Sequence, residues 1–279
     1  MEVDRDYRCD SEFYKLLVRQ PDVDLTVAAL ELARDANPHL EFQTTLEWIA
    51  QRAKEIAGPV ALAKNEIDAL KELGRCIADR HGIFGDTQAF DCAESSFLPR
   101  VIETGRGIPI SLSLLYRAVA SHVGIDLMGV SAPRHYLMRY EAVAGPMFLD
   151  AFGHGQILDY QQCVGWLKNI TRIPKKQIVS ALRPAAPRTT IIRMLNNLKA
   201  LYTQQENWGA AWTVQHRLTA LEPSSYQQRR DLALISVRAD RPGQAVDLLG
   251  SCLKTCPDGE REVLEHHLSQ AQGQLARWN

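Results

Sequence analysis

A histidine and an aspartate in the middle of the chain are placed for acid–base chemistry. His135 begins a β-prone run, Tyr136–Val143, and Asp150 lies in the next such run, after a Gly145-Pro146 turn. Strands joined by a short turn pair antiparallel, so we expect the two side chains to meet. An imidazole oriented by a carboxylate can act as a general base towards a thiol, a hydroxyl or a water molecule. The same pair can instead fasten two strands together without doing chemistry.

The elements that must position this pair are indicated by hydrophobic periodicity. Proline at 109 opens a strongly apolar helical pattern that ends at Gly124, as is usual for proline and glycine at the two ends of a helix. A further β-prone run, Leu127–Val130, precedes the two that carry His135 and Asp150. These patterns predict one helix followed by a small antiparallel ribbon. Residues 157–170 return to a helical pattern.

The N-terminal part of the chain is predicted to be helical. Apolar residues recur at helical spacing between residues 11 and 81. Pro38 and Pro59 mark expected breaks, because proline lacks an N–H donor and disfavours helix for the residue before it. Residues 82–97 mix glycine, acidic, serine and aromatic residues without periodicity, which predicts an irregular loop.

The C-terminal third contains an internal repeat. Three residue types recur at a separation of 34 residues, the period of the tetratricopeptide helix-turn-helix. The pairs are Leu198 and Leu232, Ala211 and Ala245, and Pro223 and Pro257. The alanines fall where the two helices of a repeat pack closely, and the prolines fall where the second helix must stop. We therefore expect two repeats and a last capping helix over residues 258–277.

The stretch from Gly107 to Gly155 resembles the papain-like core of transglutaminases. In that family a cysteine begins a helix, a histidine begins a strand and an aspartate lies on the next strand. His135 and Asp150 match the second and third roles. Together with the C-terminal repeats, the chain resembles the SirB-type bacterial proteins.

The resemblance implies an α+β fold in which a helical N-terminal part packs on a core of one helix and a small antiparallel sheet, followed by an all-α tetratricopeptide segment. The expected divisions are a SirB-type transglutaminase-like domain at 1–172 (helical over 1–100, core 101–172), a proline-containing linker at 173–188 and the repeats at 189–279.

Short motifs carry the resemblance and also depart from it. Ser95-Ser96-Phe97-Leu98 stands where the family is expected to have Asn-Ser-Phe-Leu. Pro133-Arg134-His135 replaces an expected Pro-Gly-His, and Asp150-Ala151-Phe152 replaces Asp-Pro-Phe. We expect Ser96, Phe97, Arg134 and Phe152 to lie beside the groove, where Arg134 would narrow it or add an anion contact.

The family's nucleophile is missing. When Gly124 is matched to the glycine that ends the nucleophile helix, and Ser113 to the small residue one turn into it, the position of the cysteine falls on Pro109. Proline has no thiol, hydroxyl or proton to transfer. The resemblance therefore implies a vestigial His135–Asp150 dyad.

Two other residues are candidate nucleophiles. Ser111 lies two residues further along the same helix, where its side chain is rotated by about 200° from that of Pro109. Cys92 lies in the loop at 82–97 and would reach His135 only if that loop folds inward.

Composition excludes several classes of protein. Of 279 residues, 46% are hydrophobic and 23% are charged, as in ordinary globular proteins. The charged N-terminus has no apolar run behind it, and no stretch approaches the ~20 apolar residues of a membrane span. The six cysteines follow neither a disulfide framework nor a zinc spacing, and no glycine-rich phosphate loop is present. We expect a cytoplasmic protein with reduced thiols, no membrane association, no cofactor and no metal.

Charge is distributed unevenly along the chain. Residues 1–103 contain 20 acidic and 12 basic residues. No acidic residue occurs between Asp159 and Glu206, where eight basic residues lie: Lys168, Arg172, Lys175, Lys176, Arg183, Arg188, Arg193 and Lys199. This basic stretch, 168–199, indicates either a solvated segment docked on the acidic half or a surface for RNA or an acidic partner.

Two functions of different classes remain open. The first is a non-enzymatic pseudo-transglutaminase, a scaffold with a possible regulatory role that binds a protein or peptide partner through its repeats or its groove. The second is a hydrolase or acyl-transferase that uses His135 and Asp150 with Ser111, Cys92 or water as the nucleophile. A weaker third is an RNA- or ribosome-associated regulator that uses the basic stretch.

Overall fold

The structure of the protein is a computed structural model that describes residues 7–277. Its contacts group the chain into two compact units. We call Pro21–Met194 the core unit, and the described residues 7–20 and 195–277 the repeat unit. The fold is α+β as expected, with helices and a small antiparallel sheet followed by a helical repeat region. The division between the units falls within one helix rather than in the linker predicted at 173–188.

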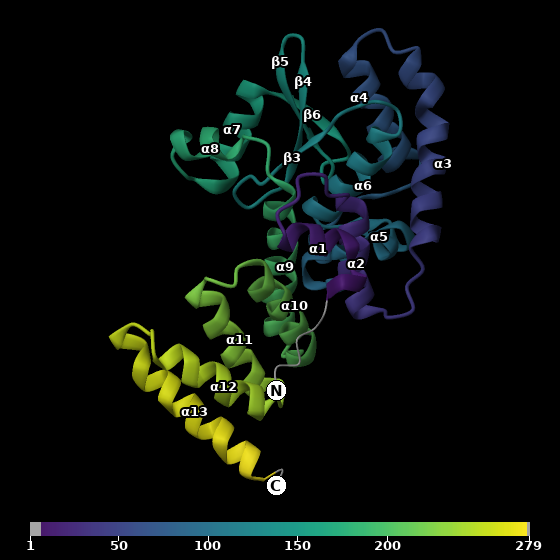
Figure 1. Ribbon diagram of the computed structural model, residues 1–279. Coiled ribbons are helices and arrows are strands. Elements are labelled where there is room, and N and C mark those ends of the chain that lie inside the picture. Colours follow the sequence, from purple (N-terminus) through teal and green to yellow (C-terminus); the bar gives the residue numbers. More distant parts are fainter. Residues whose placement is uncertain (1–6, 278–279) are drawn as a thin grey trace. The chain divides into compact units, whose positions relative to one another are not determined.

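Helices make up the first part of the core unit (Figure 1). They are α2 (Leu25–Ala36), α3 (Phe42–Ala61), α4 (Glu66–Gly74), the π-helical turn η2 (Arg75–Arg80) and α5 (Leu98–Thr104). The side chain of Asp24 begins α2 by accepting hydrogen bonds from the backbone N–H groups of Thr26 and Val27 at 2.8 and 3.2 Å. Such an N-cap satisfies donors that have no partner within the helix.

The break predicted at Pro59 is not where the structure ends the helix. Pro59 lies inside α3, which continues to Ala61. Proline removes the hydrogen bond that its own N–H would donate to the residue four positions earlier, and its ring crowds the carbonyl group of that residue. Because α3 ends two residues later, the loss is confined to its last turn.

The loop predicted at 82–97 contains only short elements. They are β1 (Phe84–Gly85) and the 3-10 turns η3 (Thr87–Asp91) and η4 (Ala93–Ser96). β1 pairs in parallel with β2 (Arg106–Gly107), which leads directly into α6 (Pro109–Ser121). This loop is thereby attached to the start of α6.

An antiparallel sheet follows α6 in the order β3-β4-β5-β6. Its strands are β3 (Met128–Val130), β4 (Leu137–Ala142), β5 (Gly145–Asp150) and β6 (Gln156–Asp159). α6 packs against β4. The sequence predicted the first three strands, but the helix expected over residues 157–170 begins only at Tyr160, because Asp159 caps α7 (Tyr160–Thr171) and the preceding residues pair with β5.

The stretch predicted as a linker, 173–188, instead contributes to the core unit. Lys175–Ala181 form α8. Ile178 and Leu182 are buried in the same apolar cluster as Val130, Phe148 and residues of α7. A segment with two buried apolar anchors is held in place by hydrophobic burial and does not behave as a free connection.

The repeat unit contains two helical hairpins and a last helix. The hairpins are α9 (Pro187–Gln204, of which the part from Leu195 belongs to this unit) with α10 (Trp208–Leu221), and α11 (Tyr226–Arg238) with α12 (Pro242–Leu253). The last helix is α13 (Arg261–Ala276). Ala211 and Ala245 are fully buried at the start of the second helices, and Pro223 and Pro257 follow the ends of those helices. The α1 helix (Ser11–Leu17) also belongs to this unit.

A buried ion pair joins the N-terminal and C-terminal chain segments that make up the repeat unit. Arg217 of α10 donates from Nη2 to Oδ2 of Asp10 at 2.6 Å, and the Arg217 side chain is only 2% exposed. Among the described residues, no helix is both long and apolar enough to cross a membrane.

Candidate functional site

His135 and Asp150 meet in the core unit. Their Nε2 and Oδ1 atoms are 2.8 Å apart, and both residues are buried, at 8% and 5% exposure. The strand register explains the contact. Met138 pairs with Leu149, so Leu137 faces Asp150 and His135 lies diagonally across, on the same side of the ribbon.

Asp150 is itself held in position by backbone groups. Its Oδ1 atom accepts a hydrogen bond from the Phe152 N–H at 3.0 Å, and its carbonyl oxygen accepts from the Gly155 N–H at 2.8 Å. Gly155 has a positive φ of 75°, and a Cβ at that position would lie 2.8 Å from the Cα of Gly74. Only glycine fits this turn, which closes behind the carboxylate.

Aromatic rings surround the imidazole of His135. The rings of Trp166 and Phe152 meet it edge-on, with centroid separations of 4.9 and 5.9 Å. Phe90, which is 50% exposed, contacts Phe152 at 5.8 Å. Phe152 lies directly against Gly85, where a Cβ would overlap the ring. Apolar rings therefore limit the rotation of the imidazole and keep water from most of it.

The other ring nitrogen of His135 is the one available for chemistry. Within residues 7–277, no hydrogen bond joins Nδ1 to another group, and the side chain keeps 10% exposure. Because Asp150 accepts from Nε2, the neutral ring carries its proton there and presents a lone pair at Nδ1. This arrangement can take a proton from a group that approaches Nδ1.

The start of α6 holds Pro109 and Ser111. Pro109 is buried in the first turn of the helix. Ser111 is also fully buried. The single proton of its hydroxyl is shared between the Ser95 and Ile108 carbonyl oxygens, at 2.6 and 3.0 Å, and its oxygen accepts from the Ile108 N–H at 3.1 Å. These bonds cap α6 and attach it to η4, so the hydroxyl serves the helix terminus.

The other residues that the sequence placed beside the groove or proposed as nucleophiles differ in how deeply they are buried. Cys92 is an exposed free thiol in the turn between η3 and η4. Ser96 and Phe97 are buried, and Phe97 is the N-cap residue of α5. Arg134 is exposed and has a positive φ of 59°, a conformation in which glycine would be less strained. Among these four, the structure gives none a hydrogen bond to His135.

One face of α6 carries hydroxyl groups that the sequence analysis did not assign to the site. Ser113 and Tyr116 lie one and two turns after Pro109, on the same face of the helix. The hydroxyls of both are buried and make no hydrogen bond with the described residues. Burial, reinforced by the charges of Asp79 and Asp150, raises the pKa of Tyr116 well above its ordinary value. Tyr116 lies seven residues after Pro109, a spacing that puts both residues on one face of a helix. This spacing is the feature of the sequence that could have pointed to Tyr116.

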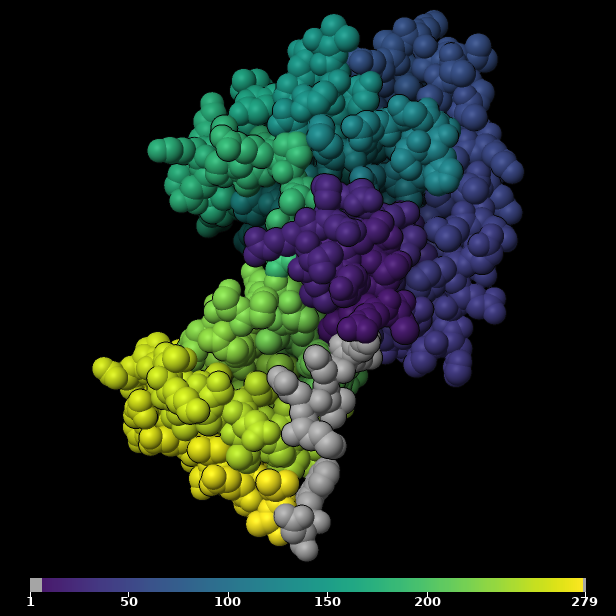
Figure 2. Space-filling model, viewed as in Figure 1, coloured from purple at the N-terminus to yellow at the C-terminus, as the bar shows by residue number. Residues whose placement is uncertain are grey.

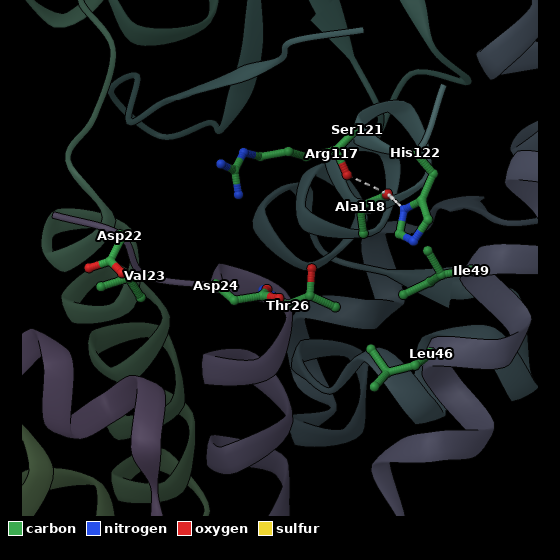
Figure 3. A pocket seen from close by; sticks show the side chains of 10 residues that line it. All are labelled: Asp22, Val23, Asp24, Thr26, Leu46, Ile49, Arg117, Ala118, Ser121 and His122. Atoms are coloured by element: carbon green, nitrogen blue, oxygen red, sulfur yellow. Dashed lines mark hydrogen bonds between the residues drawn. The ribbon is translucent and has the colours of Figure 1, made fainter. Parts of the chain in front are cut away.

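A separate pocket of about 330 Å³ lies in the core unit (Figure 3). Arg117 comes from the second half of α6 and His122 follows that helix; Asp24 is the N-cap residue of α2, Thr26 lies in its first turn, and Ile49 comes from α3. Arg117 is eight residues beyond Pro109, about 12 Å along the helix axis. This pocket therefore lies away from the position of the family's nucleophile.

The basic stretch is divided between internal contacts and the surface. Arg193 donates to Ser131 and Ala132 at 2.9 and 2.6 Å, and burial lowers its pKa. Lys199 pairs with Asp231 at 3.2 Å. Five basic residues are exposed: Lys168, Arg172, Lys175, Lys176 and Arg183. They belong to the α7–α8 segment, which is green in the space-filling view (Figure 2).

Comparison with known families agrees with the fold. Residues 41–196, more than half of the chain, match the model of the Transglutaminase-like superfamily. The chain belongs to this superfamily. Residues 198–268 match a tetratricopeptide repeat model.

The chain is similar over most of its length to bacterial proteins that share both parts. A UPF0162 protein of Xylella fastidiosa is 27% identical over 266 residues, covering 90% of this chain and 88% of the relative. A UPF0162 protein of Vibrio cholerae is 24% identical, with coverages of 92% and 93%. Protein SirB1 of Salmonella typhimurium is 25% identical, with coverages of 85% and 87%. These relatives confirm the resemblance to the SirB-type family. No solved structure matches the chain.

Proposed function

We propose that the protein is a non-enzymatic interaction protein, in which a pseudo-transglutaminase body is joined to repeats that bind a protein or peptide partner. The observation that carries this proposal is that the first turn of α6 offers no free nucleophile. Pro109 occupies the place where the family resemblance puts the nucleophile, and the Ser111 hydroxyl is engaged with the backbone of Ser95 and Ile108. Both groups serve structure rather than catalysis.

A row of charges across the repeat unit supports partner binding there. Lys199 of α9 pairs with Asp231 of α11, and Arg230 of α11 pairs with Glu260, just before α13, at 2.7 Å. The row thus crosses the first helices of successive repeats. Stacked repeats commonly present such a surface to an extended peptide or a helix.

The partner-binding proposal can be tested with selected peptides. Peptides chosen from a displayed random library against the full chain are measured by calorimetry against Arg230→Glu. We expect at least about a tenfold loss of affinity, because the substitution reverses one charge of the row. The matched control is Asp247→Lys on the exposed side of α12. Equal affinity of the selected peptides for Arg230→Glu and the unchanged chain would contradict this site.

The absence of catalysis is tested separately. The thiols are blocked with iodoacetamide, and the chain is assayed against peptide, amide and ester substrates beside His135→Ala. We expect the two proteins to give the same background rate. Turnover that survives alkylation and disappears in His135→Ala would refute the non-enzymatic proposal.

One observation favours a second candidate, a hydrolase or acyl-transferase. The imidazole is oriented by Asp150, and its Nδ1 atom is without a hydrogen-bond partner among residues 7–277. In this candidate a water bound at Nδ1 is the nucleophile, and His135 acts as its general base. The same assay separates the two candidates.

The RNA-binding alternative rests on the exposed cations of α7 and α8. It predicts salt-sensitive binding of single-stranded RNA that weakens when Lys175 and Lys176 are changed to alanine. We propose a cytoplasmic location, because the spacing of the cysteines in the sequence is unlike that of a disulfide framework.

A further inference from the structure

Three side chains of metal-ligand type converge in the core unit, away from His135 and Asp150 in the sequence. They are Glu55 of α3, Cys76 of η2 and His81, which follows η2. One ligand atom from each lies within 4.8 Å of the other two. Neither the family resemblance nor the proposed function assigns a role to them.

The π-helical turn η2 is what brings Cys76 and His81 together. In an α-helix five residues turn through about 500°, which would leave the two side chains about 140° apart around the axis. In a π-helix the hydrogen bond runs from residue i+5 to residue i, so these two positions lie above one another. The His81 N–H donates to the Cys76 carbonyl oxygen at 3.2 Å, which is this bond. Single π turns are rare and frequently occur at functional sites.

Glu55 is oriented towards the two residues by its own contacts. Its Oε2 atom lies 2.8 Å from Nε2 of His81 and 3.7 Å from Sγ of Cys76. Its Oε1 atom is 2.8 Å from a guanidinium nitrogen of Arg52. The two carboxylate oxygens therefore have different partners: Oε1 contacts Arg52, and Oε2 faces the thiol and the imidazole. A fixed outer contact of this kind is typical of the carboxylates that bind metal ions.

His81 is supported on a further side by an aromatic ring. Trp48 of α3 meets the imidazole edge-on at 5.9 Å, and Arg52 lies over the Trp48 ring at 5.0 Å. The Cys76 side chain is fully buried, whereas His81 and Glu55 are 27% and 35% exposed. The three groups thus have a dry inner side and a solvent-facing outer side, through which an ion could enter.

We propose that Glu55, Cys76 and His81 bind one divalent zinc-class transition-metal ion. Thiolate, imidazole and carboxylate are the ligands that Zn²⁺ uses in proteins, and three of them leave a fourth tetrahedral position for water. Ligand atoms at bond lengths of about 2.0–2.3 Å lie about 3.3–3.8 Å apart around such an ion. The Glu55 Oε2–Cys76 Sγ distance of 3.7 Å already fits this range. The Glu55 Oε2–His81 Nε2 pair, at 2.8 Å, would open by about 0.5 Å. The Cys76 and His81 ligand atoms lie within 4.8 Å and would close by about 1.5 Å at most.

Binding requires the thiol of Cys76 to lose its proton. Burial raises the pKa of this thiol to about 11, so it is protonated at neutral pH when no metal is bound. A metal ion deprotonates a coordinating thiol outright, and the proton leaves to solvent. The carboxylate of Glu55 needs no such step, because its hydrogen bond with His81 lowers its pKa. His81 donates that bond through Nε2. For Nε2 to bind the ion, the ring must carry its proton on Nδ1 instead, and the bond to Glu55 is replaced by the two bonds to the metal.

The experiment is a Co²⁺ titration of the full-length, tag-free protein with reduced thiols, followed by displacement with Zn²⁺. We expect one equivalent to bind and to give a near-ultraviolet thiolate-to-cobalt charge-transfer band, together with the visible bands of a tetrahedral ion. Cys76→Ser should remove the charge-transfer band. Glu55→Gln and His81→Gln should each weaken binding by at least about tenfold.

Matched controls separate this site from adventitious binding. Cys92→Ser removes an exposed thiol, and His39→Gln removes an exposed imidazole; both should bind Co²⁺ like the unchanged chain. Glu55 is at the surface, so Glu55→Gln remains a test even if Cys76→Ser folds poorly. A charge-transfer band that persists in Cys76→Ser, or Co²⁺ affinity unchanged in Glu55→Gln, would overturn the proposal.

Discussion

The imidazole of His135 is fastened to the carboxylate of Asp150 by a 2.8 Å contact, and Oδ1 of the same carboxylate also accepts the Phe152 N–H. The contact therefore ties the start of β4 to the end of β5. We expect this pair to contribute to the stability of the core unit.

Removal of the Asp150 carboxylate tests that contribution. We expect Asp150→Ala to lower the free energy of unfolding by about 1–3 kcal/mol, because it leaves the buried His135 Nε2–H and the Phe152 N–H without their acceptor. Urea unfolding followed by circular dichroism measures the change. The control, Asp126→Ala, removes an exposed carboxylate and should alter stability by less than about 0.5 kcal/mol. A similar small effect for both variants would show that the pair is not a structural fastening.

Ser111 provides a second test, because its hydroxyl is buried and makes three hydrogen bonds at the start of α6. Ser111→Ala should cost about 1–3 kcal/mol, since it leaves buried backbone groups without their partner. Ser180→Ala on the exposed side of α8 is the control. Labelling of Ser111 by a fluorophosphonate would contradict the structural role and revive Ser111 as a nucleophile.

The thiols should differ sharply in reactivity. The thiolate is the reactive form, and burial raises the pKa of Cys76 to about 11 and that of Cys163 to about 12. At pH 8 both stay protonated, so iodoacetamide should modify exposed Cys92 first. Peptide mass spectrometry over time gives the three rates. Faster modification of Cys76 than of Cys92 at pH 8 would show that Cys76 is neither buried nor protonated.

Gly155 tests the turn behind Asp150. Gly155→Ala should destabilise the protein by at least about 1 kcal/mol, because its φ is positive and the new Cβ would lie 2.8 Å from Gly74. The control, Gly165→Ala in α7, is the same substitution, but the added Cβ would have no atom within 4 Å. It should stabilise the protein by about 0.5–1 kcal/mol, as alanine does in a helix. Thermal unfolding midpoints compare the two, and shifts of the same sign would contradict the role of the turn.

Local patterns in the sequence were sufficient for some features. The 34-residue recurrence predicted the two helical hairpins, because each repeat is built from its own local sequence. The strand-turn-strand pattern around Gly145-Pro146 predicted that His135 and Asp150 meet, since alternation along paired strands fixes which side chains share a face.

Other features were decided only by tertiary structure. Ile178 and Leu182 look like isolated apolar residues in a proline-containing stretch, and only their burial beside α7 shows that 173–188 is packed rather than free. The partner of the Ser111 hydroxyl is a carbonyl sixteen residues away in sequence. Such contacts have no periodic signal, because they depend on how elements pack and not on how each one repeats.

The cluster of Glu55, Cys76 and His81 shows most clearly what could not be predicted from the sequence. The spacing of Cys76 and His81 places them on different sides of an ordinary α-helix, and Glu55 lies in another helix. The π turn and the packing of α3 beside it bring the three groups within 4.8 Å. The sequence by itself determined the family, the repeats and the His135–Asp150 pair, whereas the folded chain alone determined which thiols, hydroxyls and carboxylates became neighbours.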